Sequence, residues 1–273
     1  GLVSALATKD YTILADKLVH ASIIDGIKLS GAPFERFRHN DMQHLALLAD
    51  KISRQGRKLL IIVESVYSMD GDQAPIREIA AIKRKHEGAL LYVDEAHAVG
   101  VEGPGGLGLV MAMGDHQADV DVIVGTLGKA LGSTGAFAIM DDTLRSWAIN
   151  RARSFIFSTA LPPVTVEWSK FVFEKSLGMD SERSHLKALG NALGRKLCNG
   201  SNSHIQPYML GNPHAAVEMS QALAADGFDV LPIRTPTVPP GTDRLRLSLS
   251  AALSIDDVEA LGRAIKTYAD EQL

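Results

Sequence analysis

The sequence predicts an α/β fold, in which a mostly parallel sheet carries helices on both faces, followed by a smaller α+β domain. Two observations support this prediction: short apolar runs alternate with helical stretches early in the chain, and the alternation stops near residue 165. We therefore expect a large domain over residues 1–170 and a small domain over residues 171–273. The apolar runs are typical of buried strands and cover residues 12–15, 59–63, 89–93, 121–125 and 136–140.

The segment between the second and third apolar runs has the pattern of a crossover helix. Pro75 suits the first turn of a helix, and Gly88 suits its end. Between them, Ile76, Ile79 and Ile82 recur at helical spacing, which predicts one apolar face. A strand, a helix and a second strand in this order form a β-α-β unit with parallel strands. Ligands of such sheets bind at the carboxyl ends of the strands, so we expect the functional residues there.

The rest of the chain alternates between longer helical patterns and short strands. We expect a helical stretch over 166–198, a strand over 205–210, a helix over 215–227 and a strand over 244–250. The Pro-rich segment 231–243 is typical of a loop. In the last strand apolar and polar residues alternate, so the leucines should face the core while Arg244 and Arg246 share the other, solvated face.

The composition is that of an ordinary globular protein. The 273 residues include 28 Lys and Arg and 32 Asp and Glu, for a net charge of −4, with 22% charged and 46% hydrophobic residues. The sequence shows no basic stripe for nucleic acid, no membrane-spanning apolar run and no signal-peptide pattern. We therefore expect a cytoplasmic protein that binds neither nucleic acid nor membrane. The single Cys198 has no neighbouring His or Cys and is expected to be a structural thiol.

Polar residues follow the second, third and fourth apolar runs, in the strings ESVYSMDGD, DEAHAVG and TLGKALGSTG. Because the carboxyl ends of parallel strands meet at one edge of a sheet, Asp94, His97 and Lys129 should surround one crevice. A carboxylate, an imidazole and an amine would meet there. Glu95 is expected to be structural, because adjacent side chains at a strand end point in opposite directions.

Two other interpretations of these strings are weaker. The letters DEAH at residues 94–97 occur in a class of helicases, but a nucleotide motor also needs the phosphate-binding pattern G-x-x-x-x-G-K-[ST]. This chain lacks that pattern, and Ala130 stands where the magnesium-binding hydroxyl would be. Asp94 and His97 lack a third ligand at a matching spacing, so we expect no metal.

A family resemblance extends over nearly the whole chain. The strings that carry it are, in order, ADKLVHASIIDGIKLSGA, FRHNDM, VESVYSMDGDQAPI, LLYVDEAHAVGVEGPGGLG, GTLGKALGSTGAF, FIFSTALPP and PTVPPGTDRLRLSLSAA. They resemble those of the α-oxoamine synthases, enzymes that use pyridoxal 5′-phosphate (PLP) as cofactor. The resemblance implies the large domain of the fold-type I PLP-dependent transferases, in a homodimer whose active sites lie at the interface.

The resemblance also implies roles for the residues around the cofactor. Lys129 would be the nucleophile that binds PLP covalently. Asp94 would pair with the ring nitrogen and keep it protonated, so that the ring can accept electrons. His97 would hydrogen-bond the phenolic oxygen, with Ser68 as a second polar contact on that side. His20 would stack on the face of the ring.

The phosphate and the substrate would be held by further residues. Thr126 would help to hold the phosphate, and Ser158 or Thr159 would reach the phosphate bound by the neighbouring subunit. Either of these two residues could instead cap the helix that follows them. The resemblance implies that Arg246 grips the substrate carboxylate through its planar pair of donors, whereas Arg244 is interpreted as a solvated charge.

The resemblance implies an enzyme that condenses an amino acid with an acyl thioester, carried by coenzyme A or by an acyl carrier protein, and releases carbon dioxide. SHIQPYML, FSTALPP and PTVPPGTDRLRLSLSAA resemble the branch that joins L-alanine to a pimeloyl thioester. TLGKALG is shared with the branch that joins glycine to acetyl-CoA, which stays an alternative, as does a catalytically silent partner subunit. The family's chains begin with a further segment that contributes to the acyl channel and to phosphate binding, and we expect this chain to lack it.

Overall fold

The computed structural model divides into two compact units. The first unit contains residues 1–67 and 73–179, and the second contains residues 68–72 and 180–273. The predicted boundary at residue 170 falls inside α7 (Pro163–Leu177), a continuous helix of the first unit, so the chain divides after that helix instead. The structure describes residues 1–198, 201 and 203–271. In these ranges no helix is both long and apolar enough to cross a membrane.

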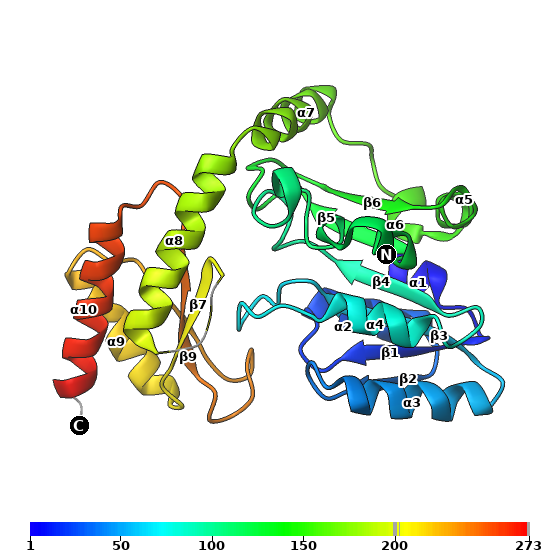
Figure 1. The fold of residues 1–273 in the computed structure, drawn as a ribbon, viewed down its shortest axis with the longest axis horizontal. Helices are drawn as coiled ribbons and strands as arrows, with labels where there is room; N and C mark the ends of the chain where they lie inside the picture. The colour runs from blue at the N-terminus through cyan, green and yellow to red at the C-terminus, as the bar shows by residue number, and fades with distance from the viewer. Residues whose placement is uncertain (199–200, 202, 272–273) are drawn as a thin grey trace. The chain divides into compact units, whose positions relative to one another are not determined.

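The first unit is built on a six-stranded sheet with the strand order β2-β1-β3-β4-β5-β6 (Figure 1). The strands are β1 (Tyr11–Asp16), β2 (Phe34–Phe37), β3 (Lys58–Glu64), β4 (Leu90–Asp94), β5 (Val122–Thr126) and β6 (Ala136–Met140). Neighbouring strands run parallel except β5 and β6, which are antiparallel. The predicted strands and the mostly parallel sheet are therefore confirmed. The prediction lacks β2, because its sequence FERF contains two charged residues and buries only Phe37.

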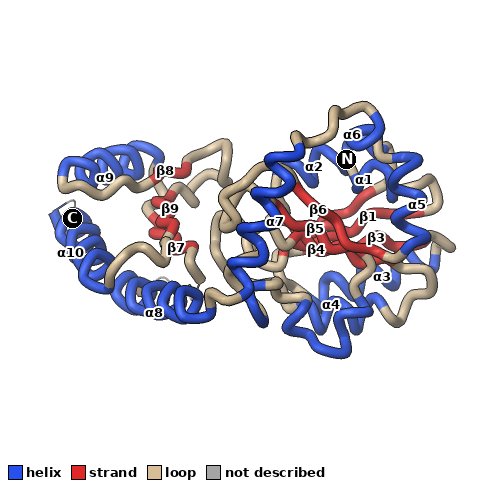
Figure 2. Tube along the Cα trace, turned by 90° about the horizontal axis from the view of Figure 1, so that it is seen from above, coloured by secondary structure: helices blue, strands red, loops and turns tan. Residues whose placement is uncertain are grey.

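Helices cover both faces of this sheet (Figure 2). Successive side chains of β3 point to opposite faces, so Leu59 and Ile61 pack into one core and Leu60 and Ile62 into another. Each of these side chains is fully buried, which stabilises the fold by about 1.5–3 kcal/mol per residue. The first core also contains residues of α3 (Met42–Arg54) and α4 (Ile76–Lys83), and the second contains residues of α1 (Leu2–Leu6) and α2 (Ala21–Ser30). The sheet is thus a packed platform for the loops at its strand ends.

Besides the helices already named, the first unit contains α5, α6 and two 3₁₀ helices. α5 (Asp142–Arg151) packs against α1, which closes the side of the unit next to β6 (Figure 1). The shorter elements are the 3₁₀ helices η1 (Pro104–Gly106) and η2 (Met111–Asp119) and the single turn α6 (Arg153–Ile156). They connect the sheet strands to one another and to α7.

The second unit combines a three-stranded antiparallel sheet with helices (Figure 1). The strands, in the order β7-β9-β8, are β7 (Ile205–Met209), β9 (Arg244–Ser248) and β8 (Leu231–Ile233), and the helices are α8 (Asp180–Leu197), α9 (Pro213–Ala225) and α10 (Ile255–Glu271). The predicted stretch 166–198 is two helices rather than one, because α7 ends at Leu177 and α8 begins at Asp180. The start of the predicted Pro-rich loop forms the short strand β8.

The interpretation of Arg244 as a solvated charge is wrong. The residue is only 5% exposed, and its guanidinium forms an ion pair with Asp70, with Nη1 2.5 Å from Oδ1. Its Nε also donates to the carbonyl oxygen of Thr242 at 2.9 Å. The physical reason is that β9 is the central strand of its sheet and the distant segment 68–72 folds onto its polar face. At Arg244, both faces of the strand are therefore buried, and the polar face is not exposed to solvent as the alternation in RLRLSLS predicted.

Candidate functional site

The carboxyl ends of the central strands bring the predicted chemical groups together in the first unit. Glu64 at the end of β3 is in register with Asp94 at the end of β4, which is in register with Val124 of β5. Beyond these ends the chain turns into the loops that carry His97 and Lys129. The parallel arrangement of β3, β4 and β5 is therefore what places three loops at the same edge of the sheet.

Lys129 and His97 are in direct contact. The Lys129 Nζ lies 2.7 Å from the Nε2 of His97, although the residues are 32 positions apart in the sequence. Lys129 sits in an exposed turn between β5 and β6, and hydrogen bonds from Leu127 to Gly135 at 2.9 Å and from Ser133 to Leu127 at 2.8 Å close that turn. The backbone thus holds an amine against an imidazole at the sheet edge.

Asp94 is a half-buried carboxyl beside this pair. Its Oδ1 accepts a hydrogen bond from the backbone N–H of Ala96 at 2.9 Å. Burial raises the pKa of Asp94, and the Ala96 bond and the positive charges of Lys129 and His20 oppose that increase. A carboxyl with these neighbours is suited to accept a hydrogen bond from a cationic ring nitrogen.

Glu64 is a site residue that is absent from the residues predicted from the sequence. It is only 3% exposed, and burial, followed by the charge of Asp94, raises its pKa to about 8. The signal was present in the sequence, because Glu64 follows the apolar run LLIIV as directly as Asp94 follows ALLYV. The same rule about polar residues at strand ends selects both carboxyls.

His20 caps helix α2 at the end of the loop that follows β1. Its Nδ1 accepts a hydrogen bond from the backbone N–H of Ser22 at 3.2 Å and lies 2.8 Å from the Ser22 hydroxyl. The loop before it is anchored by Asp16, whose fully buried carboxylate accepts from the N–H of Leu18 at 2.8 Å and of Asn40 at 2.9 Å. These bonds hold an exposed imidazole at the carboxyl end of β1.

Thr126 ties together the turn that carries Lys129. Its Oγ1 accepts from the N–H of Gly128 at 3.2 Å and donates to the carbonyl of Gly135 at 3.3 Å. Ser158 and Thr159 lie exposed in the loop between α6 and α7. Neither caps a helix, because α7 begins at Pro163 and has Pro162 in the N-cap position. The interpretation of these two residues as a helix cap is therefore wrong.

Ser68 and Arg246 both belong to the second unit and are joined to each other. The Nε of Arg246 donates to the carbonyl oxygen of Ser68 at 2.6 Å, and its Nη1 donates to the hydroxyl of Ser248 at 2.7 Å. Burial lowers the pKa of Arg246 from its ordinary value. Within this unit, Arg246 is a half-buried cation whose orientation is set by two hydrogen bonds.

Glu95 fixes the loop that follows His97, which confirms its expected structural role. Its fully buried carboxylate accepts hydrogen bonds from the backbone N–H groups of Leu109 and Val110, both at 2.9 Å. Burial raises the pKa of Glu95 to about 7, although these two hydrogen bonds act to lower it. The two adjacent acids at the end of β4 thus have different partners. Asp94 accepts a hydrogen bond from the N–H of Ala96, whereas Glu95 accepts hydrogen bonds from the loop at Leu109 and Val110.

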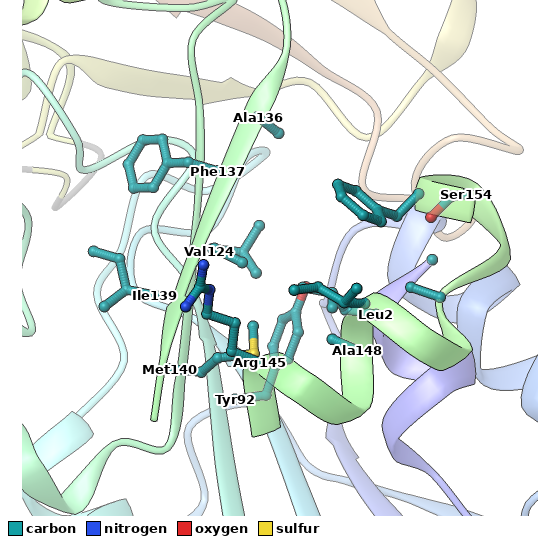
Figure 3. A pocket seen from close by; sticks show the side chains of 15 residues that line it. Leu2, Tyr92, Val124, Ala136, Phe137, Ile139, Met140, Arg145, Ala148 and Ser154 are labelled. Atoms are coloured by element: carbon teal, nitrogen blue, oxygen red, sulfur yellow. The ribbon is translucent and has the colours of Figure 1, made fainter. Parts of the chain in front are cut away.

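An apolar cavity of about 870 Å³ lies next to β6 and is separate from this group of residues (Figure 3). Tyr92 of β4, Val124 of β5, Met140 of β6 and Leu2 and Ala148 of the neighbouring helices line it, and the predicted site residues do not. Burial raises the pKa of the Tyr92 hydroxyl, so this group stays neutral.

Comparison with known proteins places the chain among PLP enzymes. The family model described as aminotransferase class I and II matches residues 1–265. A putative 8-amino-7-oxononanoate synthase of Pasteurella multocida is 44% identical over 99% of this chain and 71% of the relative, and an 8-amino-7-oxononanoate synthase of Chlorobaculum parvum is 43% identical over 98% and 69%.

Two solved structures extend this comparison. A serine palmitoyltransferase from S. paucimobilis with a bound PLP–myriocin aldimine superposes with a TM-score of 0.92 at 31% identity, over 99% of this chain and 69% of that one. An 8-amino-7-oxononanoate synthase from Francisella tularensis superposes with a TM-score of 0.84 at 28% identity, over 99% and 79%. The fold is therefore common to this chain and both enzymes.

Proposed function

Because this chain belongs to the aminotransferase class I and II family, as an α-oxoamine synthase with PLP as its cofactor, we propose that it joins L-alanine to a pimeloyl thioester and releases carbon dioxide and 8-amino-7-oxononanoate. The observation that supports the proposal most strongly is the 2.7 Å contact between Lys129 and His97 beside Asp94. The printed names of the relatives support the choice of substrates.

The residues at the strand ends fit the cofactor. PLP contains an aldehyde, a basic ring nitrogen, a phenolic oxygen and a phosphate, and when bound it supplies an electron sink for carbon–carbon bond formation and decarboxylation. Lys129 would bind the aldehyde carbon, Asp94 would accept a hydrogen bond from the protonated ring nitrogen, and His97 would contact the phenolic oxygen. His20 would lie on the ring face. Thr126 would contact the phosphate from the turn that it stabilises.

Lys129 and His97 also provide a route for protons. Two nitrogens 2.7 Å apart share a hydrogen bond, so one of them must act as acceptor. The Lys129 amine, held beside the cofactor, would accept the proton removed from the substrate carbon. His97 would hold the Lys129 amine in position for this transfer. The proton would return through the same amine at the end of the cycle.

Substrate binding is assigned to the second unit, and one contact with the cofactor is assigned to a partner subunit. Arg246 would bind the carboxylate of the amino acid, because its planar guanidinium offers paired donors and its orientation is fixed by Ser68 and Ser248. Ser158 or Thr159 would reach the phosphate of the cofactor in the other subunit of a homodimer. The assignment of Ser158 or Thr159 predicts a homodimer, which we propose is cytoplasmic. Ser68 would be a second polar contact on the side of the phenolic oxygen.

The proposal is tested by measuring thiol release from three substrate pairs. We expect release with L-alanine and pimeloyl-CoA, and much less with glycine and acetyl-CoA or with L-serine and palmitoyl-CoA. Lys129→Ala should abolish the release, since it removes the amine that binds the cofactor. A preference for the glycine pair would instead make the chain a glycine C-acetyltransferase. No release with any pair from a PLP-loaded protein would favour a catalytically silent subunit.

A further inference from the structure

Glu64 is a buried carboxyl that the proposed chemistry leaves without a task. It is 3% exposed, and its Oε1 has no hydrogen-bond partner among the described residues. Four groups from different elements act on it: the carboxyls of Asp94 in β4 and of Asp16 at the end of β1, the backbone N–H of His20 before α2, and the amine of Lys129 in the turn after β5. Two of these four groups are acids, so a charge on Glu64 would meet repulsion as well as attraction.

We propose that Glu64 is a positioning residue that stays protonated and uncharged, while Asp94 beside it carries the single negative charge that meets the ring nitrogen of PLP. This inference rests on the proposed role of Asp94. The register of β3 and β4 makes the two carboxyls direct neighbours at a sheet edge. Two carboxylates in such a place cannot both be ionised without a large penalty from desolvation and mutual repulsion.

The surroundings decide which of the two acids keeps the proton. Asp94 is only half-buried and accepts a 2.9 Å hydrogen bond from the backbone N–H of Ala96, which stabilises its charged form. Glu64 is more deeply buried, and the unpartnered Oε1 leaves half of a carboxylate charge without a donor. The proton therefore belongs on Glu64.

The pKa values agree with this division. Burial is the largest cause that raises the pKa of Glu64, to about 8, and the charge of Asp94 adds to it. The backbone N–H of His20 and the charge of Lys129 act in the opposite direction and are smaller. At neutral pH the pair then presents one negative charge to a cationic ring. An ionised Glu64 would compete with Asp94 for the proton and for the hydrogen bond to the ring nitrogen.

The direct test is the titration of Glu64 in the 273-residue chain, with and without PLP. Glutamate side chains are labelled with ¹³C, and the carboxyl resonance of Glu64 is assigned by its absence in Glu64→Gln. Without PLP we expect its midpoint near pH 8, against the ordinary 4.5. A midpoint near the ordinary value would overturn the proposal.

The dissociation constant for PLP gives a second readout that a purely structural role would not change. Glu64→Gln keeps the size and neutrality of the protonated acid, so its affinity at pH 7 should stay within a few-fold of the wild type. In the wild type the affinity should change as pH passes about 8, and in Glu64→Gln that step should be missing. Loss of affinity by tenfold or more in Glu64→Gln at pH 7 would show that a charge on Glu64 is needed, which contradicts the proposal.

These measurements separate the inference from the proposed function. If Glu64 titrates near pH 8 and PLP binds but L-alanine and pimeloyl-CoA do not react, the substrates are wrong and the role of Glu64 stands. If thiol is released while Glu64 titrates near 4.5, the function stands and the inference fails.

Discussion

Gly108→Ala tests the packing that supports the site. Gly108 has a φ of +100°, and a Cβ at this position would overlap the Glu95 carboxylate, with the Cδ atom only 2.7 Å away. That carboxylate cannot move without losing its hydrogen bonds to Leu109 and Val110. The substitution therefore adds a backbone strain and displaces a buried, doubly hydrogen-bonded acid.

The magnitude follows from these two effects. Backbone strain at a positive φ costs about 1–3 kcal/mol. A hydrogen bond to a charged group contributes about 1.5–3 kcal/mol, so loss of both Glu95 bonds adds about 3–6 kcal/mol. Gly114→Ala is the matched control, because Gly114 also has a positive φ of +60° but has no atom within 4 Å of an added Cβ. The difference between the two variants therefore isolates the displacement of Glu95.

The assay is urea unfolding at pH 8, where Glu95, with a pKa of about 7, is mostly ionised. With a slope of about 1–3 kcal/mol per molar urea, we expect the midpoint of Gly108→Ala to lie at least about 1 M below that of Gly114→Ala. The affinity for PLP should fall in Gly108→Ala as well, because Glu95 is adjacent to Asp94. Equal midpoints for the two variants would refute the view that Glu95 anchors this loop.

Three further outcomes follow from the same contacts. Below pH 4.5 Glu64 is neutral in both the folded and the unfolded chain, and between 4.5 and about 8 it ionises only in the unfolded chain, so the wild type loses stability as pH rises through this window. The free energy of unfolding of Glu64→Gln, measured in urea, should therefore rise relative to that of the wild type by on the order of a few kcal/mol between pH 5 and pH 8. A difference between the two proteins that stays constant with pH would contradict this. Arg244→Ala should destabilise the second unit by about 3 kcal/mol, because it leaves Asp70 without its ion pair. If the variant unfolds at the same temperature as the wild type, the ion pair does not stabilise this unit. Arg246→Ala should raise the KM for L-alanine at least about tenfold with Arg246→Lys intermediate, whereas a change confined to kcat would argue against carboxylate binding.

The central strands and the residues at their ends could be predicted from the sequence, because a strand that is buried on both faces of the sheet consists of a continuous apolar run. LLIIV and ALLYV are strands of this kind, and the polar residue after each marks the sheet edge. Edge strand β2 gives no such run, since only one of its residues is fully buried. The break between α7 and α8 was also missed, because a single Gly178 inside a helical pattern does not by itself end a helix.

The contacts that escaped prediction depend on tertiary structure. The partner of Arg244 is Asp70, which is 174 positions away in the sequence, and alternation along a strand contains no information about such a partner. The pairing of Glu64 with Asp94 depends on the register of β3 against β4. The 2.7 Å contact between Lys129 and His97 likewise needs two loops to have defined conformations. The sequence indicates which residues stand at the strand ends, and the fold decides which of them touch.

The most direct test of this account is to locate PLP on the chain. PLP is added to the protein, its bond to lysine is fixed by borohydride reduction, and the modified peptide is identified by mass spectrometry. Lys175→Ala, in which an exposed lysine of α7 is removed, serves as the control. We expect the label on Lys129 in the wild type and in Lys175→Ala, and no label in Lys129→Ala. A label on another lysine, or equal labelling of Lys129→Ala, would contradict the assignment of the active site.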